Sequence, residues 1–266
     1  MSLDIFPLTP QHVLYYISHL NLMGYASTSI TSYVSALGFL HRILDLPDPT
    51  LNCLVQKVLA GVNKIFGKVD SRLPITTFIL HRLVLSTTTV FKVRYHRILL
   101  NAMFLTAFFG LFRVGEITMQ KDGSISLFLK DVTVLKNSVD IAITNFKHNE
   151  AKQPFVIHLL PQQCVDLCPV RALTAYLELR GSLPGPLFCF ADLKPIPREF
   201  FTSKLKACLQ FCGLDTHLYL SHSFRVGAAS YLAAAGYTAL QIKTLGRWKS
   251  DAFKRYIRQL CYHLGS

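Results

Sequence analysis

A run of mostly apolar residues from Ile98 to Phe112 is the feature that most constrains the fold of this chain. It lies between Arg97 and Arg113 and contains the polar residues Asn101 and Thr106. A transmembrane helix needs about 20 predominantly apolar residues, so this run is too short to cross a bilayer. We therefore expect a buried core helix, which would give the charged side chain of Arg113 a rigid support.

The residues before this run predict a small all-helical domain. Thr9-Pro10 is typical of a helix start, because threonine caps the first turn and proline fits the first helical position. Further helices are expected over roughly 27–44 and 51–66, and the polar segment 67–74 marks a boundary. We expect two domains, 1–70 and 71–266. The predicted buried face of the second helix comprises Ile30, Tyr33, Val34, Leu37, Leu40 and Ile43.

The sequence of the second domain predicts helices packed around a few short strands. The apolar spacing changes from helical to alternating after residue 125, with turn residues at 136–138 and 147–150. The expected fold class is mainly α with a small antiparallel β-sheet (α+β). Strands are expected near 126–129, 131–135, 139–144 and 155–160, and helices near 76–90, 95–111, 169–180, 197–212, 223–235, 238–245 and 251–260.

Positive charge is concentrated in the second domain. The chain has a formal net charge of +13, but residues 1–70 carry four basic and four acidic side chains. The remaining residues hold 24 of the 28 Lys and Arg. This segregation favours nucleic acid as a partner over a solvated basic face or an acidic membrane surface.

Seven cysteines are present, and an odd number argues against a complete disulfide framework. Cys164/Cys168 and Cys208/Cys212 are four residues apart rather than three, and no histidine cluster adjoins them in the sequence. We expect buried free thiols in a reducing intracellular compartment, with zinc binding as the alternative. No signal peptide is recognisable, and no metal or cofactor site is expected.

Two arginines and a histidine have the chemistry to hold a phosphate. Glu116 follows Arg113 by about one helical turn and can hold its guanidinium, although a plain helix-terminal ion pair would have the same spacing. His222 and Arg225 are three residues apart and can share one helical face. Arginine can clamp two phosphate oxygens, and histidine can donate to phosphate or transfer a proton.

Three further residues could complete such a site. Tyr256 lies in Lys254-Arg-Tyr-Ile-Arg258, an unusual setting for a core tyrosine because cations flank it. Trp248 offers an indole N–H, with core packing as the ordinary alternative. Lys147 lies in a predicted turn, where it could protonate a leaving oxygen or simply be exposed; Lys152 is the next candidate. The cations expected to contact DNA are Lys249, Lys254, Arg255 and Arg258.

Together these segments resemble the tyrosine recombinase (phage integrase) family over nearly the whole chain. The resemblance rests on Gly110-Leu-Phe-Arg113-Val-Gly-Glu116, Lys147 in a hairpin, His222-Ser-Phe-Arg225, Gly246-Arg-Trp248 and Tyr256-Ile-Arg. All follow the family's order. The region from Gly246 to Arg258 is most similar to recombinases of DIRS- and Ngaro-type retrotransposons.

The resemblance implies site-specific DNA cleavage and rejoining without metal or cofactor. Tyr256 would attack the scissile phosphate and form a 3′-phosphotyrosine. Arg113 and Arg225 would stabilise the phosphorane, and Lys147 would protonate the leaving 5′-oxygen. Glu116 would support the clamp, while His222 and Trp248 would supply further donors. Double-stranded DNA and a self-assembled tetramer are the implied partners.

The same resemblance leaves two other functions open. Residues 1–70 would be a SAM-like core-binding domain lacking its first helix, and only ten residues follow Tyr256. These features fit a DNA-binding remnant that no longer cuts. A type IB topoisomerase would share the chemistry. In a eukaryotic host we expect a nuclear protein.

Overall fold

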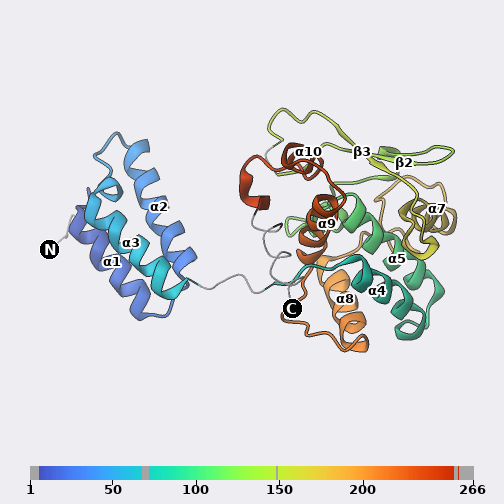
Figure 1. The fold of residues 1–266 in the computed structure, drawn as a ribbon. Helices are drawn as coiled ribbons and strands as arrows, with labels where there is room; N and C mark the ends of the chain where they lie inside the picture. Colours follow the sequence, from blue (N-terminus) through green and yellow to red (C-terminus); the bar gives the residue numbers. More distant parts are fainter. Residues whose placement is uncertain (1–5, 68–71, 148, 255–256, 258–266) are drawn as a thin grey trace. The chain divides into compact units, whose positions relative to one another are not determined.

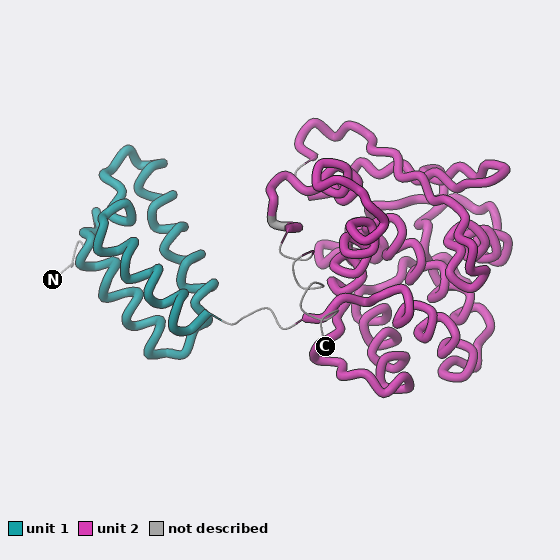
Figure 2. The backbone as a smooth tube through the Cα atoms, viewed as in Figure 1, with its two compact units in different colours: residues 1–70 teal, residues 71–266 magenta. Residues whose placement is uncertain are grey.

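The computed structural model describes residues 6–67, 72–147, 149–254 and 257 (Figure 1). The chain divides into two compact units, Met1–Asp70 and Ser71–Ser266 (Figure 2). The smaller unit is helical, and the larger unit combines helices with a small sheet, which confirms the α+β fold class.

Three helices of the smaller unit pack against one another around a common core. They are α1 (Pro10–Leu22), α2 (Ser27–Ile43) and α3 (Cys53–Phe66), with a 3₁₀ turn, η1, at Pro49–Leu51. Thr9 caps α1 as predicted. Its hydroxyl accepts from the His12 backbone N–H at 3.3 Å, and its own N–H donates to His12 Nδ1 at 3.2 Å. The core residues are Val13, Ile17, Leu20, Ile30, Val34, Val55 and Leu59.

The predicted buried face of α2 is partly wrong. Tyr33, Leu40 and Ile43 are exposed, whereas Gly38 and His41 are buried. His41 is satisfied in this position because its Nε2 accepts from the Leu8 N–H at 3.0 Å and its Nδ1 lies 2.9 Å from the Leu37 carbonyl oxygen. Apolar periodicity cannot identify a buried histidine whose ring nitrogens are both bonded.

The apolar run forms α5 (Arg94–Phe109), the central helix of the larger unit. Its buried residues, from Leu99 to Phe108, face neighbours on several sides because α4 (Thr77–Val90), α7 (Pro169–Arg180) and α9 (Ser223–Ala234) pack around it (Figure 1). This confirms the expectation of a core helix. None of the helices in the described parts of the chain is both long and apolar enough to cross a bilayer. The remaining helical elements are α6 (Val114–Ile117), α8 (Arg198–Phe211), α10 (Ala239–Leu245), η2 (Leu129–Asp131), η3 (Val165–Leu167) and η4 (Asp251–Phe253).

Three antiparallel strands form the sheet in the order β1 (Val132–Val134), β2 (Val139–Ile143) and β3 (Phe155–Leu159). Ile141 pairs with Ile157 across the centre. Alternate residues of β2 are buried, as expected for a strand with one face on the core. Lys147 lies in the turn that joins β2 to β3.

The expected strand at 126–129 is absent from the described structure. Phe128 makes one isolated bridge, to Pro186, and then the chain turns into η2. Two features explain the change. The Asp131 carboxylate accepts from the Phe128 N–H at 2.8 Å, and Pro186 has no N–H with which to extend a ladder. The helix expected over 251–260 begins as the 3₁₀ turn η4, and most of its remainder lies outside the described residues.

The expectation of uniformly buried thiols is also wrong. Cys53 and Cys164 are exposed, and all six described cysteines are free thiols. Cys261 lies outside the described residues. The buried cysteines are Cys168, Cys189, Cys208 and Cys212.

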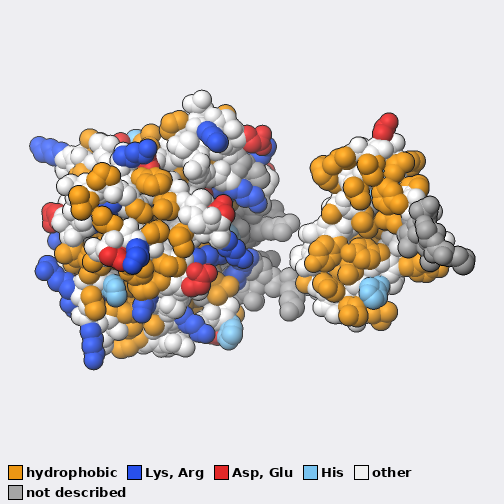
Figure 3. Space-filling model, turned by 180° about the vertical axis from the view of Figure 1, so that it is seen from behind, with side chains coloured by type: hydrophobic (Ala, Val, Ile, Leu, Met, Phe, Trp, Pro, Cys, Tyr) orange, Lys and Arg blue, Asp and Glu red, His pale blue; other side chains and the backbone are white. Residues whose placement is uncertain are grey.

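Basic side chains are distributed over the larger unit on the face drawn in Figure 3. Of the coloured side chains of the smaller unit in that view, most are hydrophobic (Figure 3). This distribution follows the sequence, because residues 71–266 contain nearly all of the Lys and Arg. An anionic partner would therefore be attracted chiefly to the larger unit.

Candidate active site

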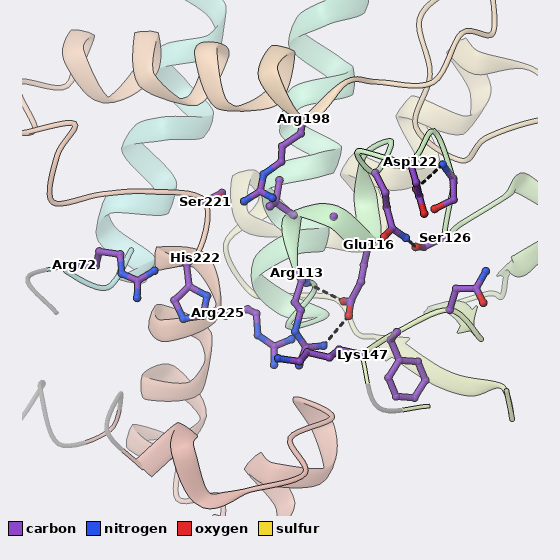
Figure 4. Close-up of a pocket in the computed structure, with 16 residues that line it drawn as sticks. Arg72, Arg113, Glu116, Asp122, Ser126, Lys147, Arg198, Ser221, His222 and Arg225 are labelled. Carbon is purple, nitrogen blue, oxygen red and sulfur yellow. Dashed lines mark hydrogen bonds and ion pairs between the residues drawn. The ribbon is translucent and has the colours of Figure 1, made fainter. Parts of the chain in front are cut away.

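A pocket of about 770 Å³ in the larger unit is lined by five Lys or Arg side chains and two carboxylates (Figure 4). We call it the cationic pocket. Such an excess of positive charge favours an anionic ligand. Its charged and histidine residues are Arg72, Arg113, Lys147, Arg198, His222, Arg225, Glu116 and Asp122.

Arg113 lies between α5 and α6, where the Glu116 carboxylate holds it. Glu116 Oε2 accepts from the Arg113 backbone N–H, and Oε1 accepts from the guanidinium, each at 2.8 Å (Figure 4). Burial alone would raise the pKa of Glu116, but the Arg247 and Arg113 guanidinia outweigh burial and hold that pKa below its ordinary value. The carboxylate is therefore charged at neutral pH, and both of its oxygens are engaged by arginine.

Arg225 is held still more firmly, with 1% of its surface exposed. Its guanidinium donates to the carbonyl oxygens of Leu111 and Gly246, the latter at 2.6 Å. The guanidinium carbon lies 4.4 Å from the ring centroid of Trp248. Arg225 thus reaches the cationic pocket as a preorganised donor group rather than a mobile side chain.

His222 immediately precedes α9, and its carbonyl oxygen accepts from the Arg225 N–H at 3.0 Å. The two residues share the pocket, as their spacing predicts. Lys147 also lines it, from the β2–β3 turn, and its side chain is exposed. In Figure 4 the nitrogen-bearing ends of Arg113, Arg225 and Lys147 meet at one side of the pocket. Lys152 is not among the lining residues.

Trp248 lines an adjacent pocket of about 420 Å³ rather than the cationic pocket, and Lys147 borders both. The indole stacks on Phe253, with ring centroids 5.4 Å apart, and also packs on Gly246. A Cβ atom on Gly246 would lie 1.6 Å from the indole ring. Glycine is therefore required for the observed position of Trp248.

The predicted DNA-binding cations are only partly described. Lys254 Nζ lies 2.7 Å from an Asp251 carboxylate oxygen, and Lys249 Nζ lies 3.9 Å from Glu150. These pairs are solvent-exposed and therefore weak, so phosphates could displace them. Tyr256, Arg255 and Arg258 lie outside the described residues.

Sequence reasoning missed two pocket arginines, Arg72 and Arg198. Arg198 is the first residue of α8, and Arg72 precedes α4. Both are far from Arg113 in the sequence, and neither lies in a recognisable motif. Only the tertiary structure places them at the same pocket.

Arg247 is the third missed residue, and its side chain is buried against Glu116, which lines the pocket. Its guanidinium NH2 donates to Glu116 Oε2 at 2.9 Å and to the Leu111 carbonyl at 3.1 Å. Burial lowers the pKa of Arg247, and the Glu116 carboxylate opposes this effect. Arginine remains charged even so. Gly246 is the C-cap of α10 with a φ of −82°, and the left-handed conformation is adopted by Arg247, whose φ is +54°.

A possible metal-ligand group lies away from the cationic pocket. His81 Nε2 and Asp166 Oδ2 are 3.1 Å apart, and Cys164 offers a third ligand atom within 4.8 Å of both. The ion pair between His81 and Asp166 is sufficient to explain their proximity. The cationic pocket has two lining carboxylates, Glu116 and Asp122. Both oxygens of Glu116 bind arginine, so among the described lining residues only Asp122 has a carboxylate that could bind a divalent cation.

No protein-family model matches the sequence. An integrase/recombinase of Selenomonas ruminantium, described as a XerD homolog, is 24% identical over 274 residues. That match covers 95% of this chain and 74% of the relative.

Solved structures of DNA recombinases share the fold. A XerH recombinase in a post-cleavage complex with palindromic difH has a TM-score of 0.68 at 16% identity, covering 98% of this chain and 72% of that one. A Tn1549 transposon integrase bound to transposon right-end DNA has a TM-score of 0.66 at 12% identity, and the match covers 100% of this chain and 88% of that one. A lambda integrase dimer bound to a COC′ core site has a TM-score of 0.61 at 16% identity, covering 94%. This chain spans 65% of the lambda integrase chain.

Proposed function

We propose that this chain, which shares the fold of solved DNA recombinases and integrases, cleaves and rejoins DNA strands through a covalent phosphotyrosine intermediate. The observation that carries the proposal is the cationic pocket, which brings Arg113, Lys147 and the His222/Arg225 pair together from three separate stretches of chain. Residues 71–266 would form the catalytic domain and residues 1–70 a core-binding domain.

In the proposed cleavage step, the Tyr256 phenol oxygen attacks the scissile phosphorus. The bond from phosphorus to the 5′-oxygen breaks, and the DNA 3′ end remains joined to the tyrosine. Lys147 donates a proton to the leaving 5′-oxygen, while His222 can accept the phenol proton. The reverse attack by a 5′-hydroxyl rejoins the strand, so the bond energy is conserved and no cofactor is required.

Arg113 and Arg225 would stabilise the negative charge on the non-bridging oxygens of the phosphorane. Each is already held by protein acceptors before substrate binds, through Glu116 for Arg113 and through two carbonyls for Arg225. Donors fixed in advance need little reorganisation during the reaction, and losing one such donor typically costs about 10²–10³-fold in rate. Trp248 would support Arg225 through the contact between its indole ring and the guanidinium.

The proposed partner is double-stranded DNA, and we propose self-association on it. The +13 charge and the location of basic residues on the larger unit support a DNA partner. A mobile element of the DIRS or Ngaro type, with nuclear residence in a eukaryotic host, remains our proposal for its source.

Covalent trapping on nicked DNA tests this function. A nick close to the cleavage site lets the short 5′-hydroxyl strand diffuse away, so the phosphotyrosine adduct accumulates and survives a denaturing gel. A nicked duplex library with a randomised core avoids assuming a target sequence. We expect an adduct from the wild type and from Tyr237→Phe, an exposed tyrosine between α9 and α10, but none from Tyr256→Phe.

Two other results would replace the proposal. Salt-sensitive DNA binding without any adduct would identify a DNA-binding remnant. An adduct accompanied by relaxation of any supercoiled plasmid, without strand exchange, would identify topoisomerase-like activity.

A further inference from the structure

Arg247 is a cation that adjoins the cationic pocket without facing it. Its side chain is 1% exposed and is not among the residues that line that pocket. The aromatic rings of Phe112, Phe146 and Phe155 surround the guanidinium, with centroids 5.1, 5.8 and 5.8 Å from its carbon. The residue borders the adjacent pocket that Trp248 also lines, but its side chain is almost wholly buried, so we expect its effect on the chemistry to act through neighbouring residues.

One connection leads from Arg247 to Arg113. The Glu116 carboxylate accepts from Arg247 through Oε2 and from the Arg113 guanidinium through Oε1. The Arg113 backbone N–H also donates to Oε2. Arg247 thereby fixes the orientation of the carboxylate that in turn orients Arg113.

A second connection leads to Arg225. The Leu111 carbonyl oxygen accepts from both Arg225 and Arg247. A second carbonyl bonded by Arg225 belongs to Gly246, the residue directly before Arg247. These two acceptors of Arg225 are therefore linked to Arg247, one by a hydrogen bond and one by the chain.

The conformation of Arg247 carries two costs to stability. Its φ of +54° lies in the left-handed region, which is unfavourable for a residue other than glycine. Its buried Nε has no hydrogen-bond acceptor among the described residues. A residue selected only to stabilise the fold would avoid both costs, whereas strain of this kind is common at functional sites.

We propose that Arg247 is a positioning residue that sets the geometry of both phosphate-clamping arginines, Arg113 and Arg225. This role rests on the proposed function. It assigns Arg247 to the site although its buried side chain does not line the cationic pocket. It also explains why the arginine beside Trp248 is buried rather than presented to the phosphate.

The test compares a phosphodiester with a methylphosphonate at the cleavage site captured from the library. A methyl group replaces one non-bridging oxygen, so the linkage is neutral and depends less on the clamp. Arg247→Met keeps an unbranched apolar side chain among the phenylalanine rings but removes the guanidinium. We expect adduct formation to slow by about tenfold or more on the phosphodiester and by under about threefold on the methylphosphonate. Arg247→Lys keeps the positive charge but loses the paired N–H donors of the guanidinium. Its rate of adduct formation should lie between those of the wild type and Arg247→Met.

Arg180→Met is the matched control. Arg180 is also buried, and its guanidinium donates to the carbonyls of Gly181, Leu183 and Pro186 at the end of α7, outside the cationic pocket. A purely structural loss should slow both substrates equally, as we expect for Arg180→Met. Equal slowing by Arg247→Met, or no slowing on either substrate, would overturn the proposal.

A second readout remains informative if the wild type forms no adduct and the proposed function fails. Guanidinium ¹⁵N resonances of Arg113 and Arg225 can be followed by NMR while inorganic phosphate is added. We expect phosphate to shift both resonances in the wild type and in Arg180→Met, but not in Arg247→Met at the same concentration. Identical phosphate-dependent shifts in Arg247→Met would contradict the positioning role.

Discussion

The Glu116 carboxylate accepts two hydrogen bonds from Arg113, one from its backbone N–H and one from its guanidinium, each 2.8 Å long. A single acidic side chain thus fixes both the start of α6 and the direction of the arginine. Because Arg247 binds the same carboxylate at 2.9 Å, Glu116 is the point at which two cations of the site meet.

Glu116→Gln should destabilise the larger unit at neutral pH by about 1–3 kcal/mol, because a buried charge-assisted network loses its anion. The pKa of Glu116 is lowered in the folded state, so its stabilising contribution is present above the unfolded pKa of about 4.3 and is lost as the pH falls through the folded value. The difference between wild type and variant should therefore narrow in acid. Chemical denaturation over a pH series measures this difference in the free energy of unfolding. Glu178→Gln, at an exposed position of α7, is the control. A difference that is constant with pH would contradict a lowered pKa for Glu116.

Arg225→Lys should slow cleavage by about 10²-fold, because lysine keeps the charge but cannot bond two carbonyls and a phosphate at fixed angles. DNA binding should change little, since one phosphate contact among many is weakened. Single-turnover adduct formation and binding at several salt concentrations separate the two effects. Unchanged cleavage would show that Arg225 serves only the fold.

Gly246→Ala should destabilise the larger unit by about 1–3 kcal/mol, because the new methyl group would overlap the Trp248 indole. The movement of Trp248 and of the Gly246 carbonyl should also slow cleavage. Gly61→Ala, in α3 of the smaller unit, is the control for the substitution itself, since an added Cβ there meets no other atom within 4 Å apart from its own helix backbone and chain neighbours. The melting temperature of each variant is compared with that of the wild type. A melting temperature of Gly246→Ala equal to that of the wild type would argue against tight packing between Gly246 and Trp248.

Lys147→Ala should slow cleavage of ordinary DNA by about 10²–10⁴-fold, the usual contribution of a general acid. A substrate with sulfur at the bridging 5′ position should restore the rate, because a thiolate leaves without being protonated. Lys152→Ala, in the same β2–β3 connection but outside the pocket lining, is the control. If sulfur fails to rescue Lys147→Ala, the proton donor is another residue.

Local signals in the sequence predict elements well where a single residue determines a boundary. Pro169 begins α7 at the expected position, and Thr9 caps α1. Pairing between distant segments is harder to predict from the sequence. The strand expected at 126–129 is replaced by η2, because Asp131 and Pro186 interrupt the ladder of backbone hydrogen bonds. That competition depends on a segment more than fifty residues away.

The candidate site shows the same limit. Arg113, His222 and Arg225 lie in short motifs, and the fold brings them to one pocket. Arg247 was not predicted, because its role depends on a left-handed backbone conformation and on partners about 130 residues away. Burial of an arginine against three phenylalanine rings has no simple sequence signal.

Identification of the DNA-linked residue tests the central claim most directly. The trapped adduct would be digested with nuclease and trypsin, and the modified peptide would be sequenced by mass spectrometry. We predict a nucleotide joined through a phosphodiester to Tyr256, with the 5′-hydroxyl strand released. Linkage to any other residue, or cleavage without a covalent intermediate, would contradict the proposed mechanism.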